Sequence, residues 1–234
     1  GKTPMVAWIA KQLRESGLRV TLLSRGYGSV NGGFNDEAME LYRRLPDVPH
    51  LQNPDRVTSA LTAIEELDAQ VLVLDDGFQH RRLARDLNIA LVDATCPFGH
   101  GHLLPRGLLR EPVGSLRRAD VVIITRTSNV TEARLQVINQ RLVSICGSTP
   151  VLKVSHVPMR LVNCNGDERS IDFLHDRNVC AFSAIGNPQA FEESLADLRA
   201  NLIGVKRFQD HHVFTEGDIR SLELLISNSN AEIL

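Results

Sequence analysis

Three absences narrow what this chain of 234 residues can be. No two of its four cysteines are spaced as C-x-x-C, so we expect neither a zinc ribbon, nor a thioredoxin-like pair, nor a dense disulfide framework. No apolar run reaches the ~18 residues that a membrane-spanning helix needs. Lysine and arginine (26) nearly balance aspartate and glutamate (28), which argues against a protein that holds nucleic acid by bulk charge. These features favour a globular protein of a reducing, cytosolic compartment, whose partners must be read from individual sites.

The chain begins with Gly1-Lys2-Thr3, which matches the end of the phosphate-binding loop G-x-x-x-x-G-K-[ST]. In that loop, backbone N–H groups surround the phosphates, the lysine reaches the outer phosphates and the hydroxyl ligates Mg²⁺. Three common residues are weak evidence, and a disordered terminus is the alternative. Residues 2–16, however, carry apolar side chains at helical spacing, so a helix begins where a bound phosphate needs one. Gly1, Lys2 and Thr3 are therefore candidate nucleotide-binding residues.

The first 150 residues alternate between short apolar runs and helical patterns. Runs rich in Val, Ile and Leu are typical of strands buried on both faces of a parallel sheet. The alternation predicts an α/β/α sandwich with a mostly parallel sheet, of the phosphate-loop NTPase type. The predicted strands are residues 18–23, 71–74, 89–92 and 121–125, and the predicted helices are residues 2–16, 55–67 and 131–146.

The pattern changes near residue 151. Asn165-Gly166 is a strong hairpin signal, and the strand-like residues 153–163 and 168–173 flank it. We predict a phosphate-loop domain at residues 1–150, a β-ribbon linker at 151–174 and a smaller α/β domain at 175–234. Within the smaller domain we predict strands at 179–183 and 202–205, helices near 189–200 and 216–227, and a final strand that begins at 231.

Two carboxylates end the predicted strand at residues 71–74: Asp75 and Asp76. In phosphate-loop proteins an acidic residue at the end of a neighbouring strand holds Mg²⁺, because a hard cation needs oxygen ligands beside the phosphates. Acidic residues also end strands simply as turn formers. Because Lys2 and Thr3 supply the complementary half, we predict a metal site formed by Thr3, Asp75 and Asp76.

The continuation after Asp76, residues 77–87, begins Gly-Phe-Gln-His, and with the two aspartates it resembles the Asp-Asp-Gly-Phe-Gln-His signature of the tetraacyldisaccharide 4'-kinase family. The resemblance covers nearly the whole chain, in the same order as in that family. Its other segments are residues 1–4, 24–28, 53–56, 103–107, 109–112 and 207–212.

The resemblance implies ATP-dependent phosphorylation of the 4'-hydroxyl of a lipid A disaccharide 1-phosphate, with ATP and Mg²⁺ as cofactors. It also implies a peripheral enzyme on the cytoplasmic face of the bacterial inner membrane, attached through a segment that precedes Gly1, and two α/β domains joined by a β-ribbon. The family's pattern extends beyond both ends of this chain. No nucleic-acid partner is expected.

The reaction needs a base that accepts the proton of the 4'-hydroxyl. The resemblance points to Asp36 and His211 as the catalytic residues for this step, because a carboxylate that orients an imidazole makes a sound base. On local sequence alone Asp36 fits better as a helix N-cap, and the histidines at 211 and 212 fit a polar loop before Thr215, a plausible N-cap with Asp218 three residues later. On the substrate side we predict Arg110 and Glu111, in a long loop that mixes arginines with leucines, together with Gln79 and His80. A solvated lid, and a core role for His80, are the alternatives.

Two other readings of the chain stay open. A different phosphate-loop protein is one, although Thr125-Arg126-Thr127-Ser128 lacks the lysine and aspartate of a guanine-specific motif. A non-catalytic fragment or decayed relative of the family is the other. Because the first half of the phosphate loop is not in this sequence, we expect the 234-residue chain to bind ATP weakly, since charge-assisted hydrogen bonds contribute about 1.5–3 kcal/mol each.

Overall fold

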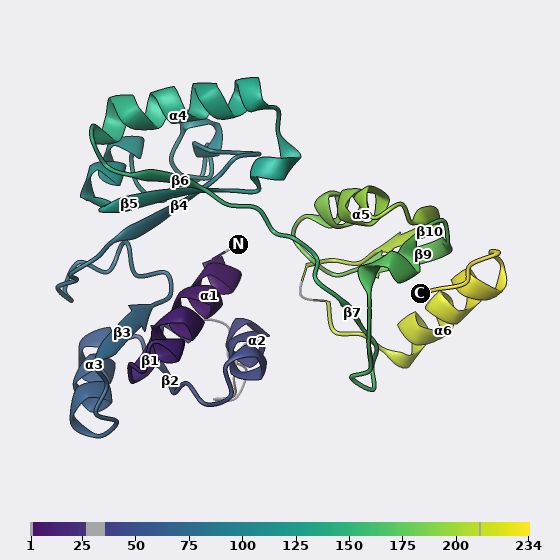
Figure 1. The fold of residues 1–234 in the computed structure, drawn as a ribbon, viewed down its shortest axis with the longest axis horizontal. Helices are drawn as coiled ribbons and strands as arrows, with labels where there is room; N and C mark the ends of the chain where they lie inside the picture. The colour runs from purple at the N-terminus through teal and green to yellow at the C-terminus, as the bar shows by residue number, and fades with distance from the viewer. Residues whose placement is uncertain (1, 27–35, 211) are drawn as a thin grey trace. The chain divides into compact units, whose positions relative to one another are not determined.

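The computed structural model describes residues 2–26, 36–210 and 212–234, with the side chains of residues 36 and 37 left out. The chain forms two compact units, Gly1–His156 and Val157–Leu234, and each is described by itself. Both units consist of helices packed on parallel strands (Figure 1). The predicted α/β class with mostly parallel sheets is therefore confirmed.

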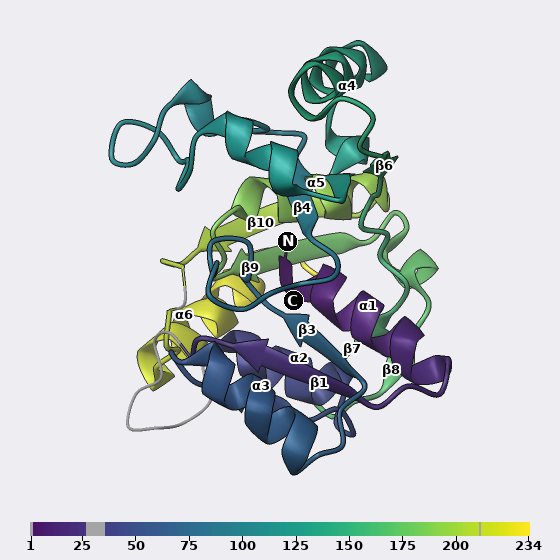
Figure 2. The ribbon, with the colours of Figure 1, turned by 90° about the vertical axis from the view of Figure 1, so that its left-hand side faces the viewer.

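The first half of the N-terminal unit is a three-stranded parallel sheet in the order β2-β1-β3. Adjacent residues of its central strand face opposite layers, because side chains alternate along a strand. Leu22 packs against α1 and α2, and Leu23 against α3. Figure 2 shows these helices around the sheet. The elements are α1 (Lys2–Glu15), β1 (Val20–Ser24), α2 (Asp36–Arg44), β2 (His50–Gln52), α3 (Arg56–Glu65) and β3 (Val71–Leu74).

The second half of this unit is another parallel sheet, in the order β4-β5-β6. Its core is formed by Val122 and Ile124 of the central strand with Ile138 and Leu142 of the covering helix α4. The elements are β4 (Ile89–Asp93), the 3₁₀ turns η2 (Gly99–Gly101) and η3 (Val113–Arg118), β5 (Val121–Thr125), the turn η4 (Thr127–Asn129), α4 (Glu132–Cys146) and β6 (Val151–Lys153). Strand β6 lies inside the predicted linker range, yet it pairs with β5 of this sheet.

The C-terminal unit has a parallel pair of strands, β9 (Asn178–Ser183) and β10 (Asn201–Arg207), with helices α5 (Pro188–Asp197) and α6 (Glu216–Ser227). The predicted hairpin around Asn165-Gly166 is present as β7 (Leu161–Val162) and β8 (Glu168–Arg169), and Gly166 has φ of 88°. The strand predicted at 168–173 is wrong beyond Arg169. There the Ser170 hydroxyl accepts a hydrogen bond from the Asp172 N–H and starts the 3₁₀ turn η5 (Ile171–Leu174).

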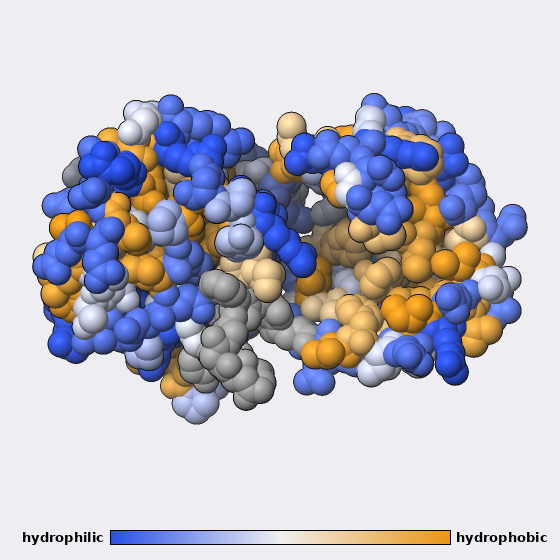
Figure 3. Space-filling model, turned by 90° about the horizontal axis from the view of Figure 1, so that it is seen from below, coloured by the Kyte–Doolittle hydropathy of each residue, from blue (hydrophilic) through white to orange (hydrophobic). Residues whose placement is uncertain are grey.

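Large apolar side chains are exposed on this C-terminal unit, which is the right-hand mass in Figure 3. Met159 is 81% exposed and Val213 is 83% exposed, and Leu224 of α6 is 61% exposed. The predicted last strand is reduced to a single bridge between Ile233 and Val179. Among the residues that the structure describes, no helix is both long and apolar enough to cross a bilayer.

Candidate functional site

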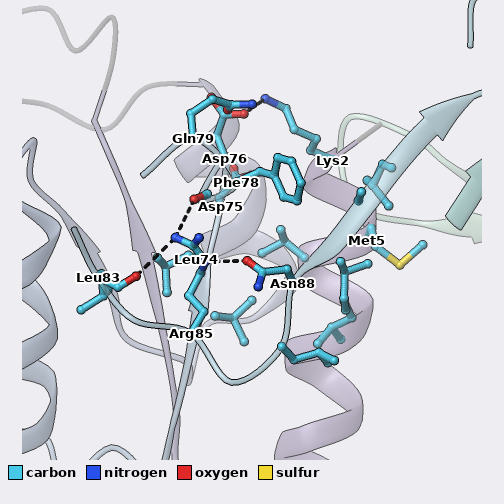
Figure 4. Close-up of a pocket in the computed structure, with 18 of the residues that line it drawn as sticks. Lys2, Met5, Leu74, Asp75, Asp76, Phe78, Gln79, Leu83, Arg85 and Asn88 are labelled. Atoms are coloured by element: carbon cyan, nitrogen blue, oxygen red, sulfur yellow. Dashed lines mark hydrogen bonds and ion pairs between the residues drawn. The ribbon is translucent and has the colours of Figure 1, made fainter. Parts of the chain in front are cut away.

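The predicted nucleotide and metal residues meet at the carboxyl end of β3, where α1 begins. Helix α1 starts at Lys2, and the Lys2 ammonium lies 2.6 Å from Oδ1 of Asp76 (Figure 4). Asp76 follows the strand with a left-handed φ of 51°, a conformation that aspartate adopts more easily than most residues. Residues 74 positions apart thus form one site, at the strand ends where ligands of open parallel sheets bind.

The two adjacent carboxylates differ sharply in environment. Asp75 is 7% exposed, and its Oδ1 is buried with no hydrogen-bond partner in the part of the chain that the structure describes. Burial raises the pKa of Asp75, reinforced by the charge of Asp76 and opposed by Lys2. Burial also acts to raise the pKa of Asp76, but hydrogen bonds and charges from Lys2 and Arg110 outweigh it and lower that pKa. Asp76 is therefore a stable carboxylate, whereas Asp75 is a buried carboxyl group with one oxygen that makes no hydrogen bond within the described part of the chain.

The oxygen atoms of Thr3, Asp75 and Asp76 are ligands of the type that a hard cation such as Mg²⁺ prefers. An orphaned buried carboxylate oxygen costs about 1–3 kcal/mol, and a divalent ion bound by oxygen ligands would satisfy it. Thr3, in the first turn of α1, is also buried, at 8% exposure. The first N–H groups of a helix lack intrahelical partners and favour an anion at this end. Thr3, Asp75 and Asp76 can therefore hold Mg²⁺, and Lys2 with the start of α1 can bind phosphate.

The loop after Asp76 is held together by two arginines that sequence reasoning did not single out. Arg85 donates from Nη1 to the carbonyls of Gly77, His80 and Leu83, and from Nε to Oδ1 of Asn88 at 2.6 Å. Arg56, 5% exposed, donates from α3 to the Asp76 carbonyl at 3.0 Å. Spacing alone did not identify them, because their partners are backbone carbonyls that any residue supplies.

His80 and Gln79 take different positions in this loop. Gln79 is exposed, so its side chain is available to a ligand. The Nε2 atom of His80 is buried and has no hydrogen-bond partner among residues 2–26, 36–210 and 212–234. Burial, reinforced by the charges of Arg56, Arg82 and Arg85, lowers the His80 pKa. A neutral imidazole with an unused nitrogen can accept or donate one hydrogen bond. The substrate role of both residues stays a prediction.

Arg110 and Glu111 lie in the same site but make different contacts. Arg110 donates from Nη1 to Oδ2 of Asp76 at 2.6 Å, so Asp76 is bound by two cations. Glu111 pairs at 2.7 Å with Arg118, whose guanidinium also lies 4.6 Å from the centre of the Phe78 ring. Burial acts to raise the pKa of Glu111, but hydrogen bonds from Arg118 and Ser115 outweigh it and lower that pKa. Arg110 thus lies beside Asp76, and Glu111 is paired with Arg118 within the protein.

The long loop that carries Arg110 is folded on itself by backbone hydrogen bonds. Leu108 donates to Gly99, Leu109 to His102, and Gly107 to Leu103. Gly107 is buried, and a Cβ there would overlap the carbonyl oxygens of His102 and Gly99. The loop therefore has a defined conformation, and that conformation requires glycine at position 107.

The predicted catalytic pair, Asp36 and His211, stays a prediction, because its side chains lie outside the described residues. Asp36 is the first residue of α2, and its side chain is not described. His211 and Gly1 also lie outside the described residues. The neighbouring His212 is described: its Nε2 lies 3.0 Å from Oδ2 of Asp218. Asp218 completes the predicted capping box with Thr215, which is confirmed.

His50, at the start of β2, is a third polar residue that was not identified from the sequence. Its Nε2 lies 2.9 Å from the hydroxyl of Ser24, at the end of β1, and its Nδ1 is buried with no hydrogen-bond partner among the described residues. Burial lowers the His50 pKa, opposed by the charge of Asp75. The carboxyl edge of this sheet is therefore more polar than the apolar strand sequences indicate.

Comparison with known proteins gives one consistent relationship. A family model described as tetraacyldisaccharide-1-P 4'-kinase matches residues 1–234. A protein of Syntrophus aciditrophicus named tetraacyldisaccharide 4'-kinase is 37% identical, over 100% of this chain and 69% of its own length. A relative of the same name from Anaeromyxobacter sp. strain Fw109-5 is 40% identical over 94% of this chain and 63% of its own. Among solved structures, LpxK from Aquifex aeolicus in complex with ATP has a TM-score of 0.66 at 30% identity, covering 93% of this chain and 71% of that one.

Proposed function

Because the chain belongs to the tetraacyldisaccharide 4'-kinase family, we propose that the protein transfers the γ-phosphate of ATP to the 4'-hydroxyl of a lipid A disaccharide 1-phosphate. The observation that carries the proposal is the meeting of Lys2 and the start of α1 with Asp75 and Asp76. The chain spans only about two thirds of the curated relatives, so the activity is proposed for the whole protein.

When bound, ATP supplies the phosphoryl group and Mg²⁺ supplies positive charge beside its phosphate oxygens. Lys2 would bind the outer phosphates, and the N–H groups at the start of α1 would bind their oxygens. Thr3, Asp75 and Asp76 would hold the cation. Lys2 and Arg110, which both contact Asp76, would neutralise phosphate charge beside it.

On the acceptor side we propose Arg110, Glu111, His80 and Gln79. A planar guanidinium suits a phosphate, which it binds with two parallel hydrogen bonds. Glu111 would act through its pairing with Arg118, which fixes the end of the loop. Asp36 and His211 stay the proposed groups that orient the 4'-hydroxyl and accept its proton.

The proposed acceptor is an amphiphile, and three leucines of the loop are exposed: Leu103 (44%), Leu104 (60%) and Leu108 (63%). A surface that places leucines beside arginines can contact acyl chains with its apolar side chains and bind a charged head group with its guanidinium groups. This supports peripheral association with the cytoplasmic face of the inner membrane, which also remains a proposal.

The test is transfer of labelled γ-phosphate from Mg-ATP to a tetraacyldisaccharide 1-phosphate in detergent micelles, by the full-length protein. We expect Lys2→Met and Asp76→Asn each to lower turnover at least about 100-fold, since each removes a charge aimed at the phosphates. Lys11→Met, on the same helix and exposed, is the matched control and should keep its turnover.

A folded protein that binds ATP but phosphorylates no disaccharide would instead favour another phosphate-loop function or a non-catalytic relative. Full turnover of Lys2→Met would show that the reaction does not use this site.

A further inference from the structure

Arg118, the last residue of the turn η3, contacts two loops of the site. We refer to residues 75–80 as the carboxylate loop and to residues 99–111 as the arginine loop. The Nη2 atom of Arg118 donates to Oε2 of Glu111 at 2.7 Å and to the carbonyl of Phe78 at 3.4 Å. The guanidinium carbon lies 4.6 Å from the centre of the Phe78 ring, within the range of a cation–π interaction. One side chain thus connects the two loops.

Both Arg118 and Phe78 are anchored in the core of the second sheet. The Phe78 ring packs against the apolar cluster formed by β4, β5 and α4, as does Leu116 of η3. Ala119, which follows Arg118, is buried in that cluster at 4% exposure. A buried neighbour in a close-packed core restricts the backbone next to it. The Arg118 side chain therefore projects from a fixed position toward the two loops.

Successive residues of the arginine loop contact the carboxylate loop at two points. Arg110 bonds directly to Asp76, and their side chains are 58% and 37% exposed. The next residue, Glu111, reaches Phe78 through Arg118. The side chains of Arg118 and Glu111 are only 31% and 23% exposed, so the second contact is the more enclosed one.

The two contacts differ in how they respond to ligands. Phosphates attract guanidinium groups and divalent cations attract carboxylates, so ligands of the site compete for both Arg110 and Asp76. Exposed ion pairs also contribute little by themselves. The enclosed contact through Arg118 is therefore the one that can hold the loops together when the site is occupied.

The carboxylate loop has other supports besides Arg118. Arg85 donates to the carbonyl of Gly77, and Arg56 donates to the carbonyl of Asp76. Loss of Arg118 leaves these donors in place on the nucleotide side of the site. The arginine loop, in contrast, loses its enclosed attachment, so the consequences should fall on the acceptor side.

We propose that Arg118 is a positioning residue: it holds the arginine loop in register with the carboxylate loop, and Glu111 acts through it rather than by contact with the disaccharide. The proposal rests on the phosphoryl transfer proposed above. In such a reaction the attacking and the attacked atoms must lie about 3–3.5 Å apart, and small displacements lower the rate steeply. The effect of Arg118 on the reaction passes through Arg110 and Glu111.

Arginine suits this position better than lysine does. A planar guanidinium lies over a ring and donates in several directions at once, whereas an ammonium is a compact point charge. A lysine at position 118 would keep the charge that attracts Glu111 but not the planar contact with Phe78. Arg118→Lys should therefore restore part of what Arg118→Gln removes.

The first test is steady-state kinetics of the full-length protein with Mg-ATP and a tetraacyldisaccharide 1-phosphate. We expect Arg118→Gln to lower kcat/KM for the disaccharide about 10–100-fold, and to change KM for Mg-ATP less than about threefold. An unchanged KM for Mg-ATP also shows that the variant is folded. Arg118→Lys should give an intermediate kcat/KM.

The matched control is Arg117→Gln, on the same turn. Arg117 donates from Nε to the Ile145 carbonyl of α4, so its loss removes a hydrogen bond outside both loops. The control should keep kcat/KM for the disaccharide within about threefold of the wild-type value. An equal loss in Arg117→Gln and Arg118→Gln, or an equal loss for both substrates, would show a merely structural role and overturn the proposal.

A double-mutant cycle decides whether Glu111 acts through Arg118. If it does, Glu111→Gln combined with Arg118→Gln lowers kcat/KM no further than either single substitution. Additive losses would mean that Glu111 contacts the disaccharide itself, which contradicts the proposal.

Hydrogen exchange tests the proposal without turnover. The Leu109 amide donates to the His102 carbonyl inside the arginine loop. We expect it to exchange at least about fivefold faster in Arg118→Gln than in Arg117→Gln, because the loop opens more often once its end is released. The His80 amide, hydrogen-bonded inside the carboxylate loop, is the reference and should stay unchanged.

The exchange measurement separates this proposal from the proposed function. Unchanged exchange at Leu109 would overturn the role of Arg118 whatever the activity of the wild-type protein. A wild-type protein without turnover, but with the expected change in exchange, would instead overturn the proposed function and support the connection between the loops.

Discussion

Arg110 binds the carboxylate of Asp76 across 34 residues of sequence, with Nη1 2.6 Å from Oδ2. The same carboxylate holds Lys2 through its other oxygen. The loop that carries Arg110 is thereby connected to the start of α1 through one side chain. Any ligand that competes for Asp76 changes the environment of both cations together.

Arg110→Ala should leave stability nearly unchanged but weaken the reaction. The Arg110 side chain is 58% exposed, and ion pairs of that kind contribute at most about 1 kcal/mol. A lost charge-assisted bond to phosphate costs about 1.5–3 kcal/mol, which corresponds to about 10–100-fold in kcat/KM for the disaccharide. Steady-state kinetics of the full-length protein checks this. Arg134→Ala, in the exposed part of α4, is the control, and equal kinetics of the two variants would remove Arg110 from the site.

Arg85→Met should destabilise the N-terminal unit by about 2 kcal/mol, because several carbonyls of the loop lose their donor at once. Urea unfolding of the 234-residue chain measures the change. Arg82→Met removes an exposed arginine three positions away and should alter the free energy of unfolding by less than about 0.5 kcal/mol. A similar loss in both variants would show that net charge, and not the carbonyl contacts, matters here.

Gly107→Ala should disrupt the loop between Gly99 and Leu109, because the added methyl overlaps two carbonyl oxygens. We expect a loss of about 1–3 kcal/mol and a rise in KM for the disaccharide. Gly114→Ala is the matched substitution, since a Cβ there meets nothing within 4 Å. Thermal melting and kinetics of both variants give the comparison; unchanged melting of Gly107→Ala would mean that the loop rearranges at little cost.

Asp218→Asn should make the stability of the folded protein depend less steeply on pH in acid. Hydrogen bonds from Thr215 and His212 lower the pKa of Asp218 from its ordinary value of 3.8. A carboxyl with a lowered pKa in the folded state adds stability above its unfolded pKa and loses it as the pH falls through the folded pKa. The wild-type protein should therefore lose stability below about pH 4 more steeply than the variant.

Melting temperatures between pH 2 and pH 6 measure the difference. Glu216→Gln, at an exposed carboxylate in the first turn of the same helix, should keep the wild-type slope. If Asp218→Asn keeps that slope as well, the capping box does not contribute to acid stability.

Much of the secondary structure could be predicted because it depends on local patterns. The strands at Val71–Leu74 and Val121–Thr125 match the predicted ranges, and α6 begins and ends at the predicted residues. The error at 168–173 arose because Ser170 caps a 3₁₀ turn, a local competition that apolar pattern alone does not reveal. Candidate metal and nucleotide residues could be named from the sequence because that chemistry restricts them to a few residue types, and their roles stay predictions.

By itself, the sequence determined the α/β class, the family resemblance and the candidate phosphate and metal residues, because periodicity and reactive side chains are properties of short segments. Only the tertiary structure decided that Asp76 holds Lys2 and Arg110 together and that Arg85 and Arg56 bind loop carbonyls. These relationships depend on backbone groups and on residues far apart in the chain. They arise only when folding brings strand ends and loops to the same place.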